Sequence, residues 1–258
     1  MLDFLKTRAQ KRDEIRSQPF PEAWREILEQ NVPYYLRRLD EADQEELRGH
    51  LQVFLAEKTF EGCGGLEITD EIRVTIAAQA CLLLLHRETD YYPDLEIILV
   101  YPAGYRAPAR EIVEGGVVIE GDQSRLGESW TRGMVVLSWE GVLTGAADIS
   151  DGHNLVLHEF AHQLDQESGA VDGAPELPRR SMYAAWARIL GREYHQLQRD
   201  DARMRPTVID PYGATNPAEF FAVITEAFFE RPRKLRACHP ELYELLKEFY
   251  NQDPGHEG

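Results

Sequence analysis

The residues best suited to chemistry form His158-Glu159-Phe160-Ala161-His162, an HExxH motif in a stretch with helical periodicity. Four residues of an α-helix turn through about 400°, so the two imidazoles stack on one face and can bind one metal ion. Glu159 lies about 100° further round, where its carboxylate can face a metal-bound water without being a ligand. This spacing is what a zinc hydrolase needs. A pair of hydrogen-bonded structural histidines is the alternative.

The helix that carries the motif has a start signal and an inward face. Asp151 or Asn154 can cap its first turn. Its apolar stripe is formed by Leu157, Phe160, Ala161 and Leu164. Imidazoles beside such a stripe are withdrawn from water and need a partner, which favours zinc. His153 lies about 140° round the helix from His158 and should not reach the same ion.

A catalytic zinc ion usually takes three protein ligands and leaves one position for water, so a third ligand must come from elsewhere in the chain. The downstream segment DPYGATNPAEFFAVITEAFFE offers Glu219 and Glu226, seven residues apart and so on one helical face. Spacing alone does not choose between them. Glu219 also has a structural interpretation, because Asn216 and Pro217 precede it as in a capping box, where the carboxylate satisfies a backbone N–H.

Other residues near the motif carry weaker signals. Asp165 either accepts a hydrogen bond from a ligand imidazole or, as we favour, pairs with an arginine such as Arg179. Glu226 is the better candidate for supporting a ligand, and a solvated helix glutamate is the alternative. The remaining histidines have no ligand-like neighbours: His50, His86, His195, His239 and His256. We expect four aromatics to lie in the core: Phe220, Phe221, Phe228 and Phe229.

Composition narrows the class of protein. The chain has 258 residues, 43% hydrophobic and 28% charged, as folded globular proteins do. Its net charge of −17 disfavours direct contact with nucleic acid or anionic membranes. The three cysteines, Cys63, Cys81 and Cys238, are odd in number and follow no disulfide or zinc-finger spacing. This favours a reducing, cytoplasmic setting. The apolar run from Ile76 to Leu85 is too short to span a bilayer and predicts a buried helix.

The order of patterns along the chain predicts an α+β fold. Residues 1–90 read as helices packed on the core, and short β-branched runs between Leu95 and Val142 predict a small mixed sheet. Helical periodicity then returns up to residue 250, so we assign 91–250 to a catalytic region with C-terminal helices. Residues 251–258 are polar and predict a flexible tail.

Several long segments agree, in order, with one known family. They are PFPEAWREIL, FLAEKTFEGCGGLEITDEIRVTIAAQACLLLL, LEIILVYP, HEFAHQLD and DPYGATNPAEFFAVITEAFFE. On these segments the chain resembles the Mlc titration factor A (MtfA) family of zinc metallopeptidases over nearly its whole length. The resemblance implies one zinc ion held by His158, His162 and Glu219, with Glu159 as catalytic base and Tyr212 beside the metal.

The resemblance also implies a zincin-like catalytic core with a gluzincin site similar to that of anthrax lethal factor. In that type a tyrosine and the ligand glutamate stand seven residues apart, as Tyr212 and Glu219 do here. It further implies aminopeptidase-like activity on peptides and, in enteric bacteria, binding to the glucose repressor Mlc.

The expected reaction is peptide hydrolysis. Zinc lowers the pKa of a bound water from 15.7 to about 7, and Glu159 takes the proton and returns it to the amine. Tyr212 would donate a hydrogen bond to the developing oxyanion, unless it is only a turn tyrosine packed on the helix. An exposed strand at 133–139 would hold the peptide by backbone pairing. The alternatives are a non-catalytic zinc protein that sequesters a DNA-binding repressor, and a latent enzyme whose loop 166–178 covers the metal.

Overall fold

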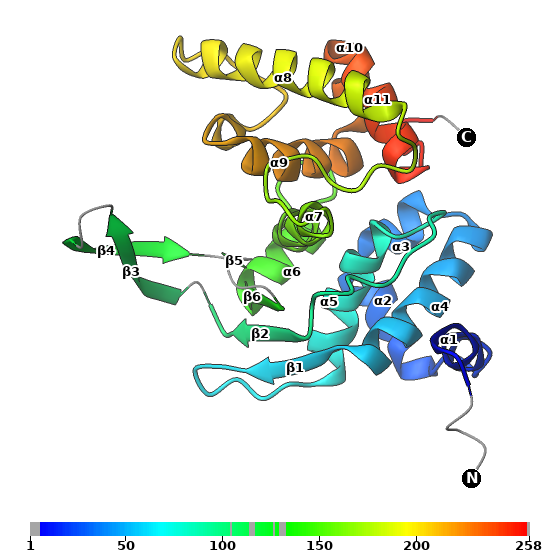
Figure 1. The fold of residues 1–258 in the computed structure, drawn as a ribbon. Helices are drawn as coiled ribbons and strands as arrows, with labels where there is room; N and C mark the ends of the chain where they lie inside the picture. Colours follow the sequence, from blue (N-terminus) through cyan, green and yellow to red (C-terminus); the bar gives the residue numbers. More distant parts are fainter. Residues whose placement is uncertain (1–5, 104, 114–116, 126, 129–132, 257–258) are drawn as a thin grey trace.

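A computed structural model describes the backbone of residues 6–103, 105–113, 117–125, 127–128 and 133–256, and the side chains of 6–103 and 133–256. Its helices are α1 (Arg8–Arg16), α2 (Glu22–Asn31), α3 (Pro33–Arg38), α4 (Glu41–Glu57), α5 (Asp70–Leu82), α6 (Trp139–Ala147), α7 (Leu155–Gln166), α8 (Met182–Asp201), the short 3-10 helix η2 (Pro211–Ala214), α9 (Pro217–Glu230), α10 (Pro232–Cys238) and α11 (Pro240–Tyr250). Its strands are β1 (Thr59–Gly62), β2 (Ile97–Tyr101), β3 (Tyr105–Val113), β4 (Val117–Arg125), β5 (Gly127–Glu128) and β6 (Met134–Ser138). The predicted α+β class, with a small mixed sheet between helical regions, is confirmed (Figure 1).

The strands form a four-stranded sheet in the order β1-β2-β6-β5 and a separate β3–β4 pair. The strands β1, β2 and β6 are parallel, whereas β5 is antiparallel to β6. In the register of β2 and β6, Ile98 faces Val135 and Val100 faces Leu137, and all four side chains are fully buried. The alternate residues are half-exposed except for Ser138, which is buried, so one face of the sheet lies against the core.

Two features of the sheet differ from the sequence-based expectations. The strand β1 forms inside the region 1–90, which the sequence predicts as helical, and it brings that region into the sheet. The strand β6 was expected to be exposed, but β5 pairs with it at Val136 and Leu137. That expectation is therefore wrong for these residues, and β6 offers no free edge there.

The N-terminal helices bury the apolar run that the sequence predicts as an interior helix. Residues 76–85 are all nearly inaccessible to solvent, and most of them belong to α5. Phe54 of α4 and Tyr92 pack against Phe160 of α7, with ring centroids 5.8 and 4.9 Å from it. Among the described helices, none combines the length and apolarity that a membrane span requires. The N-terminal helices thus pack against one side of α7.

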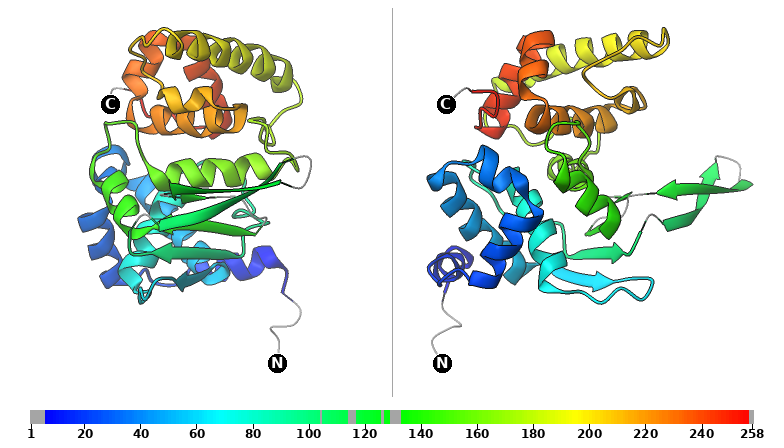
Figure 2. Two further views of the ribbon diagram at one scale, coloured as in Figure 1. Left: turned by 90° about the vertical axis from the view of Figure 1, so that its left-hand side faces the viewer. Right: turned by 180° about the vertical axis from the view of Figure 1, so that it is seen from behind.

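The C-terminal helices cover the other side of α7. Figure 2 shows α7 between the sheet and α9, with α8 on the far side of α9. Trp186 of α8 and Phe249 of α11 each pack on Phe221 of α9, with centroids 5.8 Å away. The four phenylalanines of α9 are buried, as predicted. Residues 251–255 are tied to this region, because Asp253 accepts hydrogen bonds from Tyr243 and Lys247.

Candidate metal centre

The helix α7 begins at a fixed point. Asn154 is its N-cap, with Oδ1 accepting a hydrogen bond from the Leu157 N–H at 3.0 Å. Its Nδ2 donates to Gln79 Oε1 of α5 at 3.0 Å and to the Gly145 carbonyl of α6 at 3.2 Å. The predicted apolar stripe along α7 is buried, and each of its members is at most 2% exposed. The helix is therefore held at its start and along one side.

The two motif histidines lie one turn apart at the edge of this buried helix. The ring centroids of His158 and His162 are 4.9 Å apart, and their side chains are 14% and 10% exposed. Both rings present Nε2 toward α9. The two imidazoles thus lie one above the other on one helix face, as the HExxH spacing predicts, with their ring planes 81° apart.

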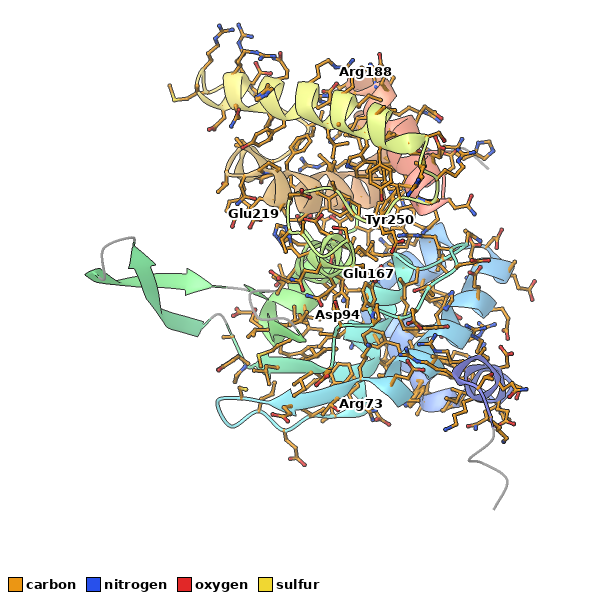
Figure 3. The ribbon with its side chains drawn as sticks, viewed as in Figure 1. Arg73, Asp94, Glu167, Arg188, Glu219 and Tyr250 are labelled. Carbon is orange, nitrogen blue, oxygen red and sulfur yellow. The ribbon has the colours of Figure 1, made fainter. Side chains whose placement is uncertain are left out.

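Glu219 reaches the histidines from the first turn of α9. Asn216 caps this helix through the backbone N–H of Glu219 at 2.9 Å, and Pro217 occupies the first helical position. The Glu219 carboxylate points toward α7 (Figure 3), with Oε2 3.0 Å from His158 Nε2 and 3.5 Å from His162 Nε2. Its side chain thus meets the imidazoles, while its backbone takes part in the cap.

These three side chains offer a set of donor atoms that suits a metal. One atom from each of His158, His162 and Glu219 lies within 4.8 Å of the others. Two imidazole nitrogens and one carboxylate oxygen are the protein ligands of many catalytic zinc sites, which leave a fourth position for water. The ligand types and their convergence therefore fit a divalent zinc ion.

Electrostatics shows how the three groups hold one another. Burial alone would lower the pKa of His158, but its hydrogen bonds to Glu219 and Glu226 outweigh this effect and raise the pKa to about 10. Burial raises the pKa of Glu219, but hydrogen bonds to both histidines overcome it and bring the pKa to about 2. The carboxylates of Glu219 and Glu226 thus favour positive charge at the place where a cation would bind.

Glu159 lies beside this cluster without being part of it. It is 4% exposed, and its Oε2 has no hydrogen-bond partner within the described residues. Burial, followed by the negative charges of Glu219 and Glu226, raises its pKa to about 7. A carboxylate of that pKa can accept and return a proton near neutral pH.

Glu226 takes a position that the sequence left open. Its Oε1 lies 2.8 Å from His158 Nδ1, and its Oε2 accepts a hydrogen bond from the Asn154 N–H at 2.6 Å. One turn further along α9, Glu230 Oε2 accepts from the Gly152 N–H at 3.0 Å. We did not predict the Glu230 contact, although its four-residue spacing from Glu226 on one helix face was the available signal.

Tyr212 lies in η2, in the turn that leads into α9. Asp210 caps this turn through the Tyr212 N–H at 2.7 Å. The Tyr212 ring centroid is 6.0 Å from that of His158, and the residue is 55% exposed. The tyrosine therefore stands beside the histidines with much of its ring open to solvent, rather than packed into the core.

Asp165 serves the loop that follows α7. Its Oδ2 accepts a hydrogen bond from the Gly173 N–H at 2.8 Å, whereas Arg179 pairs with Glu248. The favoured pairing of Asp165 with Arg179 is therefore wrong. The other candidate role is not seen either, because Asp165 Oδ1 and His162 Nδ1 both lack a partner among the described residues. Trp186 Nε1 donates to the Gly173 carbonyl at 2.9 Å, so this loop is anchored at Gly173.

The other histidines lie apart from this cluster. His153 Nδ1 is 3.5 Å from Asp210 Oδ2, on the turn that carries Tyr212. The expectation that the remaining histidines have no ligand-like neighbours is wrong for His86, whose ring nitrogens lie 2.9 Å from Asp43 and 3.1 Å from Glu46. The acidic pair comes from the first turns of α4, which the linear pattern did not connect with His86. The expectation is also wrong for His50, 3.2 Å from Glu46, and for His239, 2.8 Å from Glu193.

Comparison with known proteins gives a consistent result. Residues 5–251 match the family described as glucose-regulated metallo-peptidase M90. An uncharacterized protein of Synechocystis is 43% identical over 242 residues, which cover 93% of this chain and 88% of that protein. Mlc titration factor A of Serratia proteamaculans is 34% identical over 85% of this chain and 84% of its own length. The Mlc titration factor A of Yersinia pestis is 32% identical over 90% and 84%, respectively.

Proposed function

Because this chain belongs to the glucose-regulated metallo-peptidase M90 family, we propose that it is a zinc-dependent peptidase. His158, His162 and Glu219 would hold one zinc ion in a zincin-like core, and Glu159 would act as general base. The observation that carries this proposal is the convergence of the three donor atoms beside Glu159, whose buried carboxylate oxygen has no hydrogen-bond partner among the described residues. A structural pair of histidines would need no such carboxylate.

The chain's own residues account for each proton movement of the proposed reaction. A bound zinc ion lowers the pKa of a coordinated water to about 7 and polarises the scissile carbonyl. Glu159, with its pKa of about 7, accepts the proton of the attacking water and then gives a proton to the leaving amine. Tyr212, beside His158, would donate a hydrogen bond to the oxygen on which negative charge develops.

We propose that the substrates are short peptides and that the enzyme has an aminopeptidase-like preference. The basis is the family resemblance described in the sequence analysis. The site is carboxylate-rich, since Glu159, Glu219 and Glu226 surround His158. This charge favours a substrate that carries a free α-amino group near the scissile bond. N-terminally blocked peptides should therefore be hydrolysed more slowly than the same peptides with a free amine.

The Glu159→Gln variant tests the proposal. The carboxamide has nearly the same shape but cannot accept the proton, so kcat should fall by about 10²–10⁴-fold. Zinc content should stay at one ion per chain, because Glu159 is not a proposed ligand. Glu140→Gln on α6, an exposed position, is the matched control and should leave kcat unchanged. Unchanged hydrolysis by Glu159→Gln would refute the assigned mechanism.

A second function is favoured by the names of two relatives, which are called Mlc titration factor A. We propose that this chain also binds a transcriptional repressor of the Mlc type. Such binding does not require Glu159, so a pull-down with purified repressor should give the same yield for wild type and Glu159→Gln. A protein that bound repressor but hydrolysed no peptide in either form would be a sequestering protein, not an enzyme.

A further inference from the structure

We propose that Glu226 is a positioning residue, which fixes the ring and tautomer of His158 for metal binding. This inference rests on the proposed zinc site and concerns a contact behind it. The Glu226 side chain is 8% exposed and uses both carboxylate oxygens, one for the His158 ring and one for the Asn154 backbone. A single rigid group thus links the imidazole to the N-terminus of its own helix.

The direction of the hydrogen bond determines which nitrogen is left for the metal. An ionised carboxylate only accepts hydrogen bonds, so the 2.8 Å contact requires a proton on His158 Nδ1. In the neutral ring the lone pair is then on Nε2, the atom that lies 3.0 Å from Glu219 Oε2. Glu226 therefore selects the tautomer whose free nitrogen faces the other ligands.

The helix start adds to the effect. The Asn154 N–H is one of the backbone donors at the N-terminus of α7, and Glu226 Oε2 accepts its hydrogen bond at 2.6 Å. Negative charge is favourable at this end of a helix. Glu226 is consequently held in place from two directions, and the ring of His158 can rotate only by breaking a charge-assisted hydrogen bond.

The two proposed histidine ligands are supported differently. His162 Nδ1 has no hydrogen-bond partner within the described part of the chain, so only its Nε2, 3.5 Å from Glu219 Oε2, has a polar contact. His158 is the imidazole that carries a specific carboxylate partner. Loss of this partner should therefore weaken the metal site through His158, with His162 unchanged.

Glu230 provides a matched control on the same helix. It is 3% exposed, compared with 6% for Glu226, and it also accepts a backbone hydrogen bond just before α7. Among the described residues, no imidazole contacts Glu230. The two glutamates thus share burial and a helix, and they differ in the contact with His158.

The test compares Glu226→Gln with Glu230→Gln in the full-length protein by zinc titration against a competing chelator. Loss of such a partner typically costs 10–100-fold in metal affinity, so the zinc Kd of Glu226→Gln should rise by about that factor. The Kd of Glu230→Gln should stay within about twofold of wild type. Equal zinc affinity for Glu226→Gln and wild type, or equal weakening in both variants, would overturn the inference.

A spectroscopic measurement on the unmutated protein keeps the inference testable if Glu226→Gln does not fold. In the zinc-loaded wild type, NMR of ¹⁵N-histidine should show a protected proton on His158 Nδ1. A His158 proton on Nε2 would overturn the inference. If wild type bound no zinc at all, the proposed function would fail together with it, whereas normal zinc binding with the wrong tautomer would remove the role of Glu226 alone.

Discussion

Glu219 Oε2 lies 3.0 Å from His158 Nε2, although the two residues stand 61 positions apart in the chain. The contact joins α7 to α9 across the inner face of the C-terminal helices. A metal ion held there would link both helices in the folded chain only, because the unfolded chain does not bring these ligands together. This relationship makes metal content a measure of the tertiary structure.

Removal of zinc should therefore destabilise the protein. At a free zinc concentration of 100 times Kd, binding to the folded state adds about 2.7 kcal/mol to the free energy of unfolding. Thermal melts with zinc and with a chelator should differ accordingly, and His162→Ala should abolish the difference. His86→Ala, in the separate cluster with Asp43 and Glu46, should retain it. If His86→Ala alone lost the zinc effect, the ion would bind at Asp43, Glu46 and His86 instead of at the proposed site.

The Gly173→Ala variant should disturb the start of α9. Gly173 has φ +77°, and a Cβ atom there would lie 2.4 Å from the Pro217 carbonyl oxygen, two residues before Glu219. The left-handed backbone costs about 1–2 kcal/mol for an alanine, and the clash must shift the loop or α9. We expect weaker zinc binding together with lower stability, measured by titration and urea denaturation.

Gly169→Ala is the control for this change. Gly169 has φ +85° in the same loop, but no described atom beyond its chain neighbours lies within 4 Å of an added Cβ atom. It should therefore lose only about 1 kcal/mol, with zinc affinity unchanged. Equal zinc affinities in the two alanine variants would show that the Gly173 contact does not position Glu219.

The Tyr212→Phe variant separates binding from catalysis. If the hydroxyl stabilises the oxyanion, its removal should lower kcat by about 10²–10³-fold, as for other oxyanion donors, with little change in KM. Because 55% of the residue is exposed, the folded state should lose little stability. An unchanged kcat would show that the Tyr212 hydroxyl takes no part in catalysis and that the residue has only a structural role in the turn.

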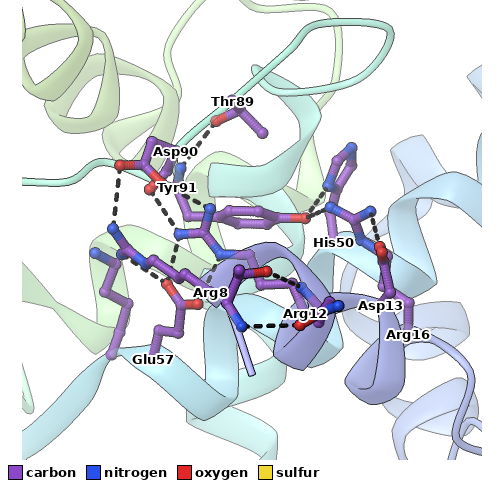
Figure 4. A network of polar contacts seen from close by, with 12 residues as sticks. Arg8, Arg12, Asp13, Arg16, His50, Glu57, Thr89, Asp90 and Tyr91 are labelled. Carbon is purple, nitrogen blue, oxygen red and sulfur yellow. Dashed lines mark hydrogen bonds and ion pairs between the residues drawn. The ribbon is translucent and has the colours of Figure 1, made fainter. Parts of the chain in front are cut away.

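Arg12 forms the centre of an ion-pair network that holds α1 on the N-terminal helices (Figure 4). Its side chain is 9% exposed and contacts Glu57 at 2.7 Å and Asp90 at 2.6 Å. Arg12→Met should cost about 2 kcal/mol of stability, less than the 3–5 of a fully buried pair, because both acids keep some contact with water. Arg8 contacts the same two acids but is 53% exposed, so Arg8→Met should cost at most about 1 kcal/mol. Equal losses in urea denaturation would contradict this account.

The sequence predicted the parts of the fold that carry a long apolar period. The helices α7, α9 and α11 lie where their periodicity placed them, within a few residues. The helix α1, with the sequence RAQKRDEIR, lies in the region 1–90 that the sequence predicts as helical, although it has almost no apolar stripe and is held by the Arg12 ion pairs. The strand β1 was missed because four residues that end in glycine are a weak signal, and its pairing with β2 supplies the order.

At the site, local spacing predicted the stacked imidazoles but not the third partner. Glu219 and Glu226 share one helix face, and both point toward α7, so spacing could not separate them. The two glutamates differ in the nitrogen of the His158 ring that each one contacts. This difference depends on the position of α9 along α7. The anchoring of Asp165 to Gly173 was likewise invisible, because the partner is a backbone N–H rather than a charged side chain.

The most direct test of the account is a crystal of the zinc-loaded protein measured by anomalous scattering at the zinc absorption edge. The account predicts one strong peak, about 2.0–2.2 Å from His158 Nε2, His162 Nε2 and a Glu219 oxygen. A peak that leaves Glu219 outside bonding distance, or that lies only at Asp43, Glu46 and His86, would contradict it.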